Sequence, residues 1–323
     1  MKKFKMPEGF ASGADISWYP QMLEDDFVFK NREGKEQDLL TTLKEYGMDS
    51  IRLRTWVNPS DNKFSGHCST GETLGFAKEC ADKGFRIMLD FHYSDSWADP
   101  GQQRKPGAWE NLSVDKLTEA LHDYTKDTME LFVKNGVVPE WVQLGNETNP
   151  GMLLPDGGTR NFEQLAALYN AGHDGVKAVS PESKTMIHLA EFNFTDFIFN
   201  YFGRLEQLGC RYDVMGFSFY PYHLPGLTYE ECMRGFRRSM KEIPERFGKD
   251  FLLVEIGGED EKEEGSYELM LDAIEVMQGQ PRCKGLFWWE PEGAKSWSGY
   301  PLSAWRGDGT PTKAMDAFLA MEL

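Results

Sequence analysis

Eight short apolar runs alternate with longer amphipathic segments along the 323 residues of this chain. A short apolar run between turn residues is typical of a buried strand, and an amphipathic segment of ten or more residues is typical of a helix that covers it. We expect strands at 10–17, 50–53, 85–91, 141–144, 184–189, 214–219, 251–255 and 285–289. We expect helices at 37–46, 71–83, 113–135, 161–179, 195–208, 228–247, 266–277 and 312–320.

This alternation favours an α/β fold, a single (β/α)8 TIM barrel. No Pro- or Ser-rich linker divides the chain, so we expect one domain over residues 1–323, with its core at about residues 10–320. A doubly wound sheet is the main alternative, but it needs no eighth strand–helix unit. The count of eight units therefore favours the barrel.

Charge and hydropathy exclude several classes of partner. The formal net charge is -17, and no basic stripe of the kind that binds nucleic acid is present. The acidity also disfavours a polyanionic substrate, so we expect a neutral one. No stretch approaches 18 apolar residues, so we expect no membrane span. The segment Met1–Lys5 has the charge of a signal peptide without an apolar region after it, which leaves the location of the protein open. We expect a monomer.

Cysteine and histidine spacing gives no sign of a metal centre. The five cysteines lie far apart without a CxxC pair, and no second histidine follows His92 at ligand spacing. The acidic run at 259–264 lacks the EF-hand pattern, and most such runs are solvated. We therefore expect no cofactor, and calcium stays open without a recognisable ligand set.

Polar side chains cluster where the expected strands end. Asn146 and Glu147 follow the strand at 141–144, and Glu255 ends the strand at 251–255. In a barrel of this kind the carboxyl ends of the strands carry the active site. A single polar strand end is usually a solvated loop, but here six strand ends carry such residues: Arg52, Arg54, His92, Asp95, Asn146, Glu147, Tyr220, Tyr222, Glu255 and Glu290.

The two glutamates have the chemistry of a glycosidase. Strand ends four and seven face each other across the mouth, which could place the carboxyl groups about 5 Å apart, the separation of a retaining glycosidase. Glu255 would be the nucleophile, kept ionised by Arg52. Glu147 would be the acid and base, which requires a raised pKa, and Asn146 could bind the sugar 2-hydroxyl. The alternative is that both glutamates are surface charges on ordinary loops.

Aromatic side chains in the expected rim loops could stack on sugar rings. Trp97, Trp289, Trp297 and Trp305 lie in or beside these loops, whereas Trp141 and Trp288 belong to apolar strands. We therefore predict substrate contacts from the following residues: Asp15, Arg52, His92, Asp95, Trp97, Asn146, Tyr220, Trp289, Trp297 and Trp305.

Five sequence blocks, Gly13–Trp18, Ile51–Trp56, Asp90–Gly101, Val142–Glu147 and Trp289–Pro291, resemble the signature blocks of glycoside hydrolase family 53. These enzymes are endo-β-1,4-galactanases with a (β/α)8 fold and belong to clan A. The resemblance implies cleavage of β-1,4-galactan, the neutral side chain of pectin, inside the polymer and with retention. It assigns the acid/base to Glu147 and the nucleophile to Glu255. A polymer substrate implies a secreted or cell-surface enzyme.

Two other functions stay open at this point. Another clan A endo-glycanase, such as a β-mannanase or a xylanase, would have the same catalytic pair and differ in the rim loops. A non-catalytic glycan-binding barrel would lack one of the two carboxylates, and both are present.

Overall fold

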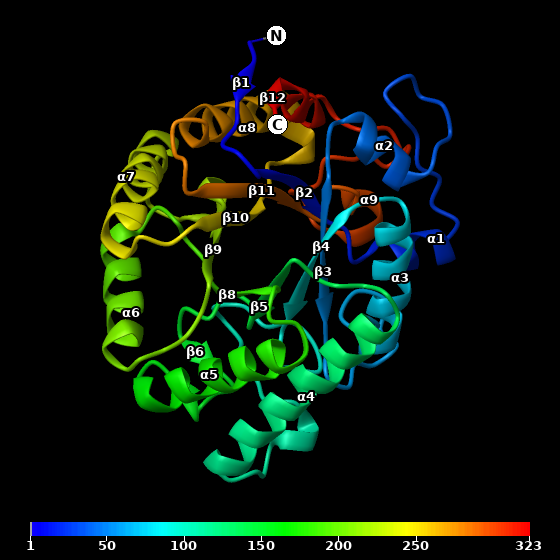
Figure 1. Cartoon of the computed structure of the whole chain (residues 1–323). Helices are drawn as coiled ribbons and strands as arrows, with labels where there is room; N and C mark the ends of the chain where they lie inside the picture. Colours follow the sequence, from blue (N-terminus) through cyan, green and yellow to red (C-terminus); the bar gives the residue numbers. More distant parts are fainter. Residues whose placement is uncertain (1) are drawn as a thin grey trace.

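The central feature of the fold is a closed barrel of eight parallel strands with helices around it (Figure 1). The computed structural model describes residues 2–323, except for the side chain of His223. Around the barrel the strand order is β10-β11-β2-β3-β4-β5-β8-β9, and closure excludes the doubly wound sheet. The predicted TIM-barrel fold is confirmed. The strands are β2 (Ala11–Asp15), β3 (Ser50–Thr55), β4 (Arg86–Phe91), β5 (Trp141–Leu144), β8 (Lys184–Leu189), β9 (Val214–Phe219), β10 (Phe251–Ile256) and β11 (Cys283–Trp289).

The long helices cover the outside of the barrel, as Figure 1 shows. They are α2 (Leu39–Glu45), α3 (Thr70–Asp82), α4 (Val114–Lys134), α5 (Phe162–Val179), α6 (Thr195–Gln207), α7 (Tyr229–Phe247) and α8 (Glu263–Met277). Capping boxes fix the starts of α3 and α7, because Ser69 and Thr228 each bond reciprocally with the glutamate three residues later.

The secondary structure differs from the prediction in several places. The closing segment is a 3-10 helix, η4 (Lys313–Ala320), and not an α-helix. A short helix, α1 (Tyr19–Glu24), follows β2 where no helix is predicted. The remaining short elements are α9 (Lys295–Ser298), η1 (Gly107–Trp109), η2 (Pro221–His223), η3 (Asp260–Lys262), and a hairpin of β6 (Gly151–Met152) and β7 (Gly157–Gly158).

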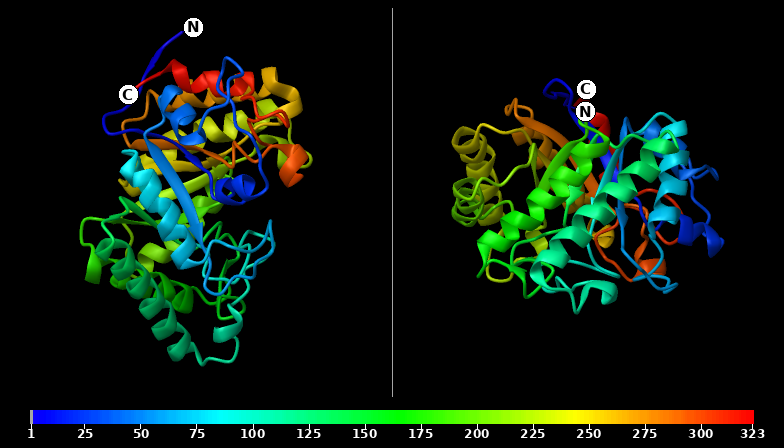
Figure 2. Two further views of the ribbon diagram at one scale, coloured as in Figure 1. Left: turned by 90° about the vertical axis from the view of Figure 1, so that its right-hand side faces the viewer. Right: turned by 60° about the horizontal axis from the view of Figure 1, so that its bottom comes forward.

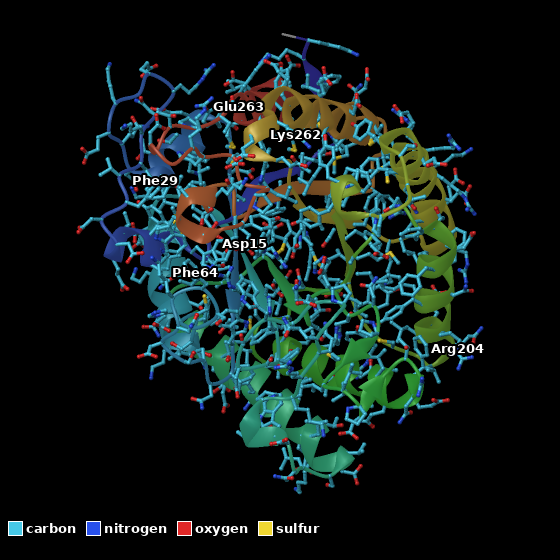
Figure 3. All side chains as sticks on the ribbon, turned by 180° about the vertical axis from the view of Figure 1, so that it is seen from behind. Asp15, Phe29, Phe64, Arg204, Lys262 and Glu263 are labelled. Atoms are coloured by element: carbon cyan, nitrogen blue, oxygen red, sulfur yellow. The ribbon has the colours of Figure 1, made fainter. Side chains whose placement is uncertain are left out.

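The barrel interior is divided into an apolar end and a polar end. A small cluster of buried apolar side chains fills one part: Ala11, Met88, Trp141, Met186, Val214, Leu252, Val254 and Phe287. Buried polar side chains from the same strands occupy the carboxyl-terminal part, among them Asp15, which lies near the middle of the ring of helices in Figure 3. Since strands deliver alternate side chains inward, the polar end is built from the last residues of several strands.

The two ends of the described chain lie side by side. β1 (Phe4–Lys5) pairs in parallel with β12 (Met321–Glu322), and both views of Figure 2 show the termini together. Among residues 2–323, no helix combines the length and the apolar character needed to cross a membrane. The assignment of residues 1–323 to one domain stays a prediction.

Candidate active site

The two predicted catalytic glutamates come together at the polar end of the barrel. One carboxylate oxygen of each, together with a ring nitrogen of His188, lies within a group whose atoms are all within 4.8 Å of one another. Glu255 is the fifth residue of β10, and Glu147 follows β5 with a φ of 45°. Gly145 makes this turn at φ 92°, where a Cβ would lie 2.8 Å from Thr148 Cγ2. The separation matches a nucleophile and an acid/base on one sugar.

Arg52 holds the Glu255 carboxylate in place from beneath the cleft. Its Nη1 lies 2.9 Å from Glu255 Oε1 and 2.9 Å from Asp15 Oδ2, and its Nη2 lies 2.8 Å from Asp90 Oδ2. Tyr220 donates its hydroxyl to the other oxygen, Glu255 Oε2, at 3.1 Å. Burial disfavours the charge of Arg52, but the three carboxylates outweigh burial and raise its pKa. The guanidinium therefore stays charged, as the sequence predicts.

The two carboxyl groups share the charge unequally. Burial raises the pKa of Glu147 to about 7, which confirms the raised pKa expected of the acid. Burial also raises the pKa of Glu255, and Glu147 raises it further, whereas Arg52 lowers it. Because the ion pair with Arg52 is direct, we assign the negative charge to Glu255 and the proton to Glu147 when the pair holds one proton.

His188, which is not among the predicted site residues, orients the loop that carries Glu147. The backbone N–H of Glu147 and the side-chain amide of Gln143 donate to its Nδ1, at 3.3 and 3.0 Å. This assigns the ring proton to Nε2, which donates to Ser218 Oγ at 2.7 Å. Burial lowers the pKa of His188 well below its usual value, so the ring is neutral. Its sequence signal is a polar residue between the apolar residues Ile187 and Leu189 of the expected strand 184–189.

The hydrogen bonds of His188 also bear on whether this cluster could bind a metal ion. Glu147, His188 and Glu255 have ligand atoms at a spacing that a metal ion could bridge. Both ring nitrogens of His188 are already hydrogen-bonded within the protein, which removes the one nitrogen ligand of the group. The cluster therefore fits an acid and a nucleophile better than a metal site.

An aromatic cleft of about 470 Å³ opens above the two glutamates. Trp18 is its centre, with ring centroids 5.9 Å from Trp97, 5.4 Å from Trp289 and 6.3 Å from Tyr300. The cleft is lined by Trp18, Trp97, Ala98, Asp99, Asn146, Glu147, Tyr220, Glu255, Trp289 and Tyr300. Aromatic faces beside a carboxylate pair suit a sugar, which has apolar C–H faces and hydroxyl edges.

A buried arginine supports the aromatic side of the cleft from beneath. Arg54 is 1% exposed, and its guanidinium carbon lies 4.5 Å from the Trp97 ring centroid and 5.5 Å from that of Trp18. It pairs with Glu290, whose other oxygen accepts the backbone N–H of Trp18 at 3.2 Å. Cation–π contacts of a desolvated arginine stabilise such ring clusters.

Four of the predicted substrate contacts line the cleft: Trp97, Asn146, Tyr220 and Trp289. The Asn146 amide accepts from Arg52 at 2.8 Å and donates one N–H to Ala98 O at 2.8 Å. Its second amide N–H has no partner in the described part of the chain, so it remains a candidate donor to a sugar hydroxyl.

Three predicted contacts lie beneath the cleft instead. Asp15 and Arg52 have 0% exposed surface, so the prediction that they touch the substrate is wrong. They act on Glu255 through the ion-pair network. His92 is 4% exposed, and its ring nitrogens contact Asp90 at 3.0 Å and the backbone N–H of Ala98 at 3.1 Å, so its predicted sugar contact has no support.

The three remaining predicted substrate contacts lie in three different surroundings. Trp305 is 0% exposed and packs in the main core, which contradicts a role in sugar stacking. Asp95 accepts the backbone N–H groups of Asn58 at 3.0 Å and Gly107 at 2.8 Å, so it ties two loops together. Trp297 is half-buried against Trp18, with its indole N–H on Asp25, and its sugar contact stays a prediction.

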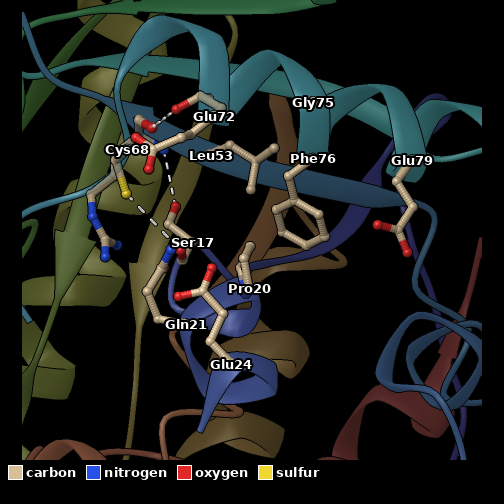
Figure 4. Close-up of a pocket in the computed structure, with 12 residues that line it drawn as sticks. Ser17, Pro20, Gln21, Glu24, Leu53, Cys68, Glu72, Gly75, Phe76 and Glu79 are labelled. Atoms are coloured by element: carbon tan, nitrogen blue, oxygen red, sulfur yellow. Dashed lines mark hydrogen bonds between the residues drawn. The ribbon is translucent and has the colours of Figure 1, made fainter. Parts of the chain in front are cut away.

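A second cavity lies away from the glutamates. It occupies about 270 Å³ between α1 and α3, with Pro20, Gln21 and Phe76 in its wall, as Figure 4 shows. Three glutamates, Glu24, Glu72 and Glu79, also line it. Neither catalytic carboxylate reaches this cavity, so it is not part of the active site.

The barrel, the paired carboxylates at its carboxyl-terminal end and the aromatic cleft above them define a retaining glycoside hydrolase. The sequence model described as glycosyl hydrolase family 53 matches residues 11–318. The chain therefore belongs to glycosyl hydrolase family 53, which confirms the resemblance noted from its sequence blocks.

Relatives and solved structures agree with this assignment. An arabinogalactan endo-β-1,4-galactanase A of Emericella nidulans is 34% identical over 254 residues, covering 75% of this chain and 69% of its own. The GH53 catalytic domain of Ignisphaera aggregans matches with a TM-score of 0.89 at 30% identity, covering 98% of both chains. A fungal β-1,4-galactanase structure matches with a TM-score of 0.87 at 26% identity, covering 96% of this chain and 98% of its own.

Proposed function

We propose that this protein is an endo-β-1,4-galactanase that cleaves β-1,4-galactan and type I arabinogalactan with retention. The observation that carries the chemistry is the pair Glu147 and Glu255, with carboxylate oxygens within 4.8 Å of one another. The family, with its relatives named for galactan cleavage, supports the choice of polysaccharide. The open aromatic cleft supports attack inside a polymer.

The reaction follows from the positions of the two carboxyl groups. Glu255 attacks the anomeric carbon as a carboxylate, and Glu147 gives its proton to the departing glycosidic oxygen, which leaves a covalent glycosyl-enzyme and a shortened chain. Glu147, now a carboxylate, takes a proton from water. The water oxygen attacks the anomeric carbon, and the bond to Glu255 breaks. Two inversions restore the β configuration.

The partner and cofactor expectations fit this reaction. A formal net charge of -17 favours a neutral polysaccharide and disfavours nucleic acid. The two steps need two carboxyl groups and water, so we propose that no cofactor takes part. We also propose that the protein acts as a monomer, because one chain supplies both carboxylates and the cleft above them.

Parallel assays on four polymers test the substrate. Reducing-sugar release should be fast on β-1,4-galactan and arabinogalactan and absent on mannan and xylan. Cleavage of mannan or xylan without cleavage of galactan would contradict the proposal and favour another endo-glycanase. Binding of galactan without cleavage would favour a non-catalytic glycan-binding barrel.

The alkaline limb of the pH profile should report Glu147. Its pKa is raised to about 7, and the group must be protonated to release the first product. We therefore expect kcat/KM on galactan oligosaccharides to fall as the pH rises through about 7. In Glu147→Ala the alkaline limb should disappear. A limb that persists in that variant would assign the acid to another residue.

Replacing two tryptophans should distinguish a ring that binds sugar in the cleft from a ring that only packs in the core. Trp97→Ala removes a ring of the cleft and should raise KM for galactan oligosaccharides about fivefold to tenfold, with little change in kcat. Trp305→Ala removes a fully buried ring and should lower the free energy of unfolding by about 3 kcal/mol, with an unchanged product pattern. Initial-rate kinetics, product chromatography and thermal melts of both variants check this. A stability loss in Trp97→Ala and a raised KM in Trp305→Ala would overturn the placement of the two rings.

A further inference from the structure

A third cavity lies at the carboxyl end of β8, across the barrel from the strand that leads to Trp18. It occupies about 380 Å³, a size that holds small-molecule ligands. It is lined by Glu191, Asn193, Phe194, Thr195, Asp196, Phe197 and Arg238. These residues belong to the loop after β8 and to α6 and α7, which are neighbours in Figure 1.

The strand order places this cavity on the acid/base side of the active site. β8 is the direct neighbour of β5, which carries Glu147, and lies four strands from β2, which leads to Trp18. Asn149 joins the two loops, because its amide accepts from Ala190 N at 2.8 Å and donates to Ala190 O at 3.3 Å. The next residue, Glu191, is near enough for its charge to raise the pKa of Glu147.

Two polar groups of this cavity, on Glu191 and Asn193, are not used by the protein itself, whereas Asp196 pairs with Arg238 and Thr195 with Ser239. Asn193 is 8% exposed, and its side-chain oxygen has no hydrogen-bond partner within residues 2–323. An unpaired buried amide oxygen costs free energy unless a ligand or water satisfies it. Glu191 is half-buried at φ 65°, and no side chain described in the structure forms a hydrogen bond or ion pair with its carboxylate. Such strain beside an active site favours a functional role.

The same cavity offers aromatic surface and a rigid frame. Phe194 and Phe197 are each 38% exposed, and the Phe197 ring lies against Tyr201 with centroids 5.9 Å apart. Arg238 on α7 joins Asp196 on α6 at 2.7 Å. Gly235 lets α7 approach the loop, since a Cβ there would lie 2.4 Å from Asn193 O. The position of the asparagine is therefore fixed by the packing of the helix.

We propose that the cavity formed by Glu191, Asn193, Phe194 and Phe197 binds a hexose on the leaving-group side of the scissile bond. The proposal rests on the proposed function, since the leaving sugar is attached to the oxygen that Glu147 protonates. Glu191 and Asn193 accept hydrogen bonds from sugar hydroxyls, and the phenylalanine rings cover its apolar face. The rings around Trp18, across the barrel, then hold the sugars on the other side of the scissile bond.

The test compares two substrates that differ on the leaving-group side. Galactan oligosaccharides place sugars there, whereas a dinitrophenyl galacto-oligosaccharide places one small aryl group there and needs no proton. Phe194→Ala and Asn193→Ala should each lower kcat/KM about tenfold on the oligosaccharides and leave the aryl substrate nearly unchanged. Leu131→Ala, which removes a side chain of matched exposure (39%) on α4, should change neither.

Results other than the expected one would count against the subsite or against the proposed function. An equal loss on both substrates, or no loss on either, would overturn the proposal, because the side chains would then not act through the leaving sugar. A burst of dinitrophenol followed by slow turnover on the aryl substrate would also overturn it, because the loop would then support Glu147. If the wild-type protein cleaves no galactan, the proposed function fails. The subsite is then tested by the same comparison on the polysaccharide that it does cleave. Thermal melts of the variants identify loss through unfolding, and Asn193→Asp, which keeps the size and the acceptor oxygen, should retain more oligosaccharide activity than Asn193→Ala.

Discussion

Glu255→Ala should lower kcat on galactan by on the order of 10⁵-fold, because no other group can form the covalent intermediate. Added azide should restore part of the activity, since the small anion fits the space left by the carboxylate. It attacks from the same face as Glu255, so the product is an α-glycosyl azide. Mass spectrometry and proton NMR of the product check both its formation and its configuration.

A matched surface variant controls for the loss of a glutamate. Glu264→Ala removes an exposed carboxylate on α8 that pairs with Lys313 and should leave kcat unchanged. Arg52 keeps Asp15 and Asp90 as partners in Glu255→Ala, so the variant should fold. A folded Glu255→Ala protein with kcat near the wild-type value would remove the nucleophile from this position.

Glu147→Ala should lower kcat/KM on galactan by roughly 10²–10⁴-fold, the usual contribution of a general acid. A dinitrophenyl leaving group departs without a proton, so the first step on such a substrate should be nearly preserved. The second step needs Glu147 as base and should become rate-limiting. A burst of dinitrophenol followed by slow turnover, seen in stopped-flow absorbance, is the expected result.

The response to azide distinguishes the two variants. In Glu147→Ala the nucleophile is intact, so azide attacks the glycosyl-enzyme and gives a β-glycosyl azide. In Glu255→Ala it gives the α anomer. The same azide anomer from both variants, or an equal loss on good and poor leaving groups, would show that the two roles are assigned wrongly.

The strands were the predictable part of the fold. An apolar run such as 141–144 is too short for a helix, and β5 has those bounds. β3 is longer than expected because Arg54 and Thr55 continue it, and an arginine at the end of a buried strand breaks the apolar pattern. α1 could not be predicted, since its six residues are too few to show a helical period.

The sequence pointed to Glu147 and Glu255 through their chemistry, and it shows only part of the buried charge around them. Arg52 and Arg54 are two residues apart in one strand, so both point to the same face, which is the inside of the barrel. That spacing is a signal for buried ion pairs, and both arginines are at most 1% exposed. Which carboxylates they meet depends on the register of neighbouring strands, which a single sequence does not give.

Trp305 and Trp18 show why the positions of loop residues are hard to predict from a sequence pattern. Trp305 follows the last strand and was predicted at the rim, but the loop folds back and pairs Trp305 with Pro311 in the core. Trp18 belongs to the block Gly13–Trp18 but not to the predicted substrate contacts, yet it contacts four other aromatic rings at the cleft. The path of a long loop depends on packing against distant elements, and no local period reports it.

Proton NMR of galactan during digestion tests the central claim most directly. Retention by Glu255 and Glu147 predicts that new reducing ends appear first as the β anomer, with the α anomer rising later by mutarotation. Products should be a series of oligosaccharides, as cleavage inside the chain requires. First appearance of the α anomer, or no new anomeric signal from galactan, would contradict the account.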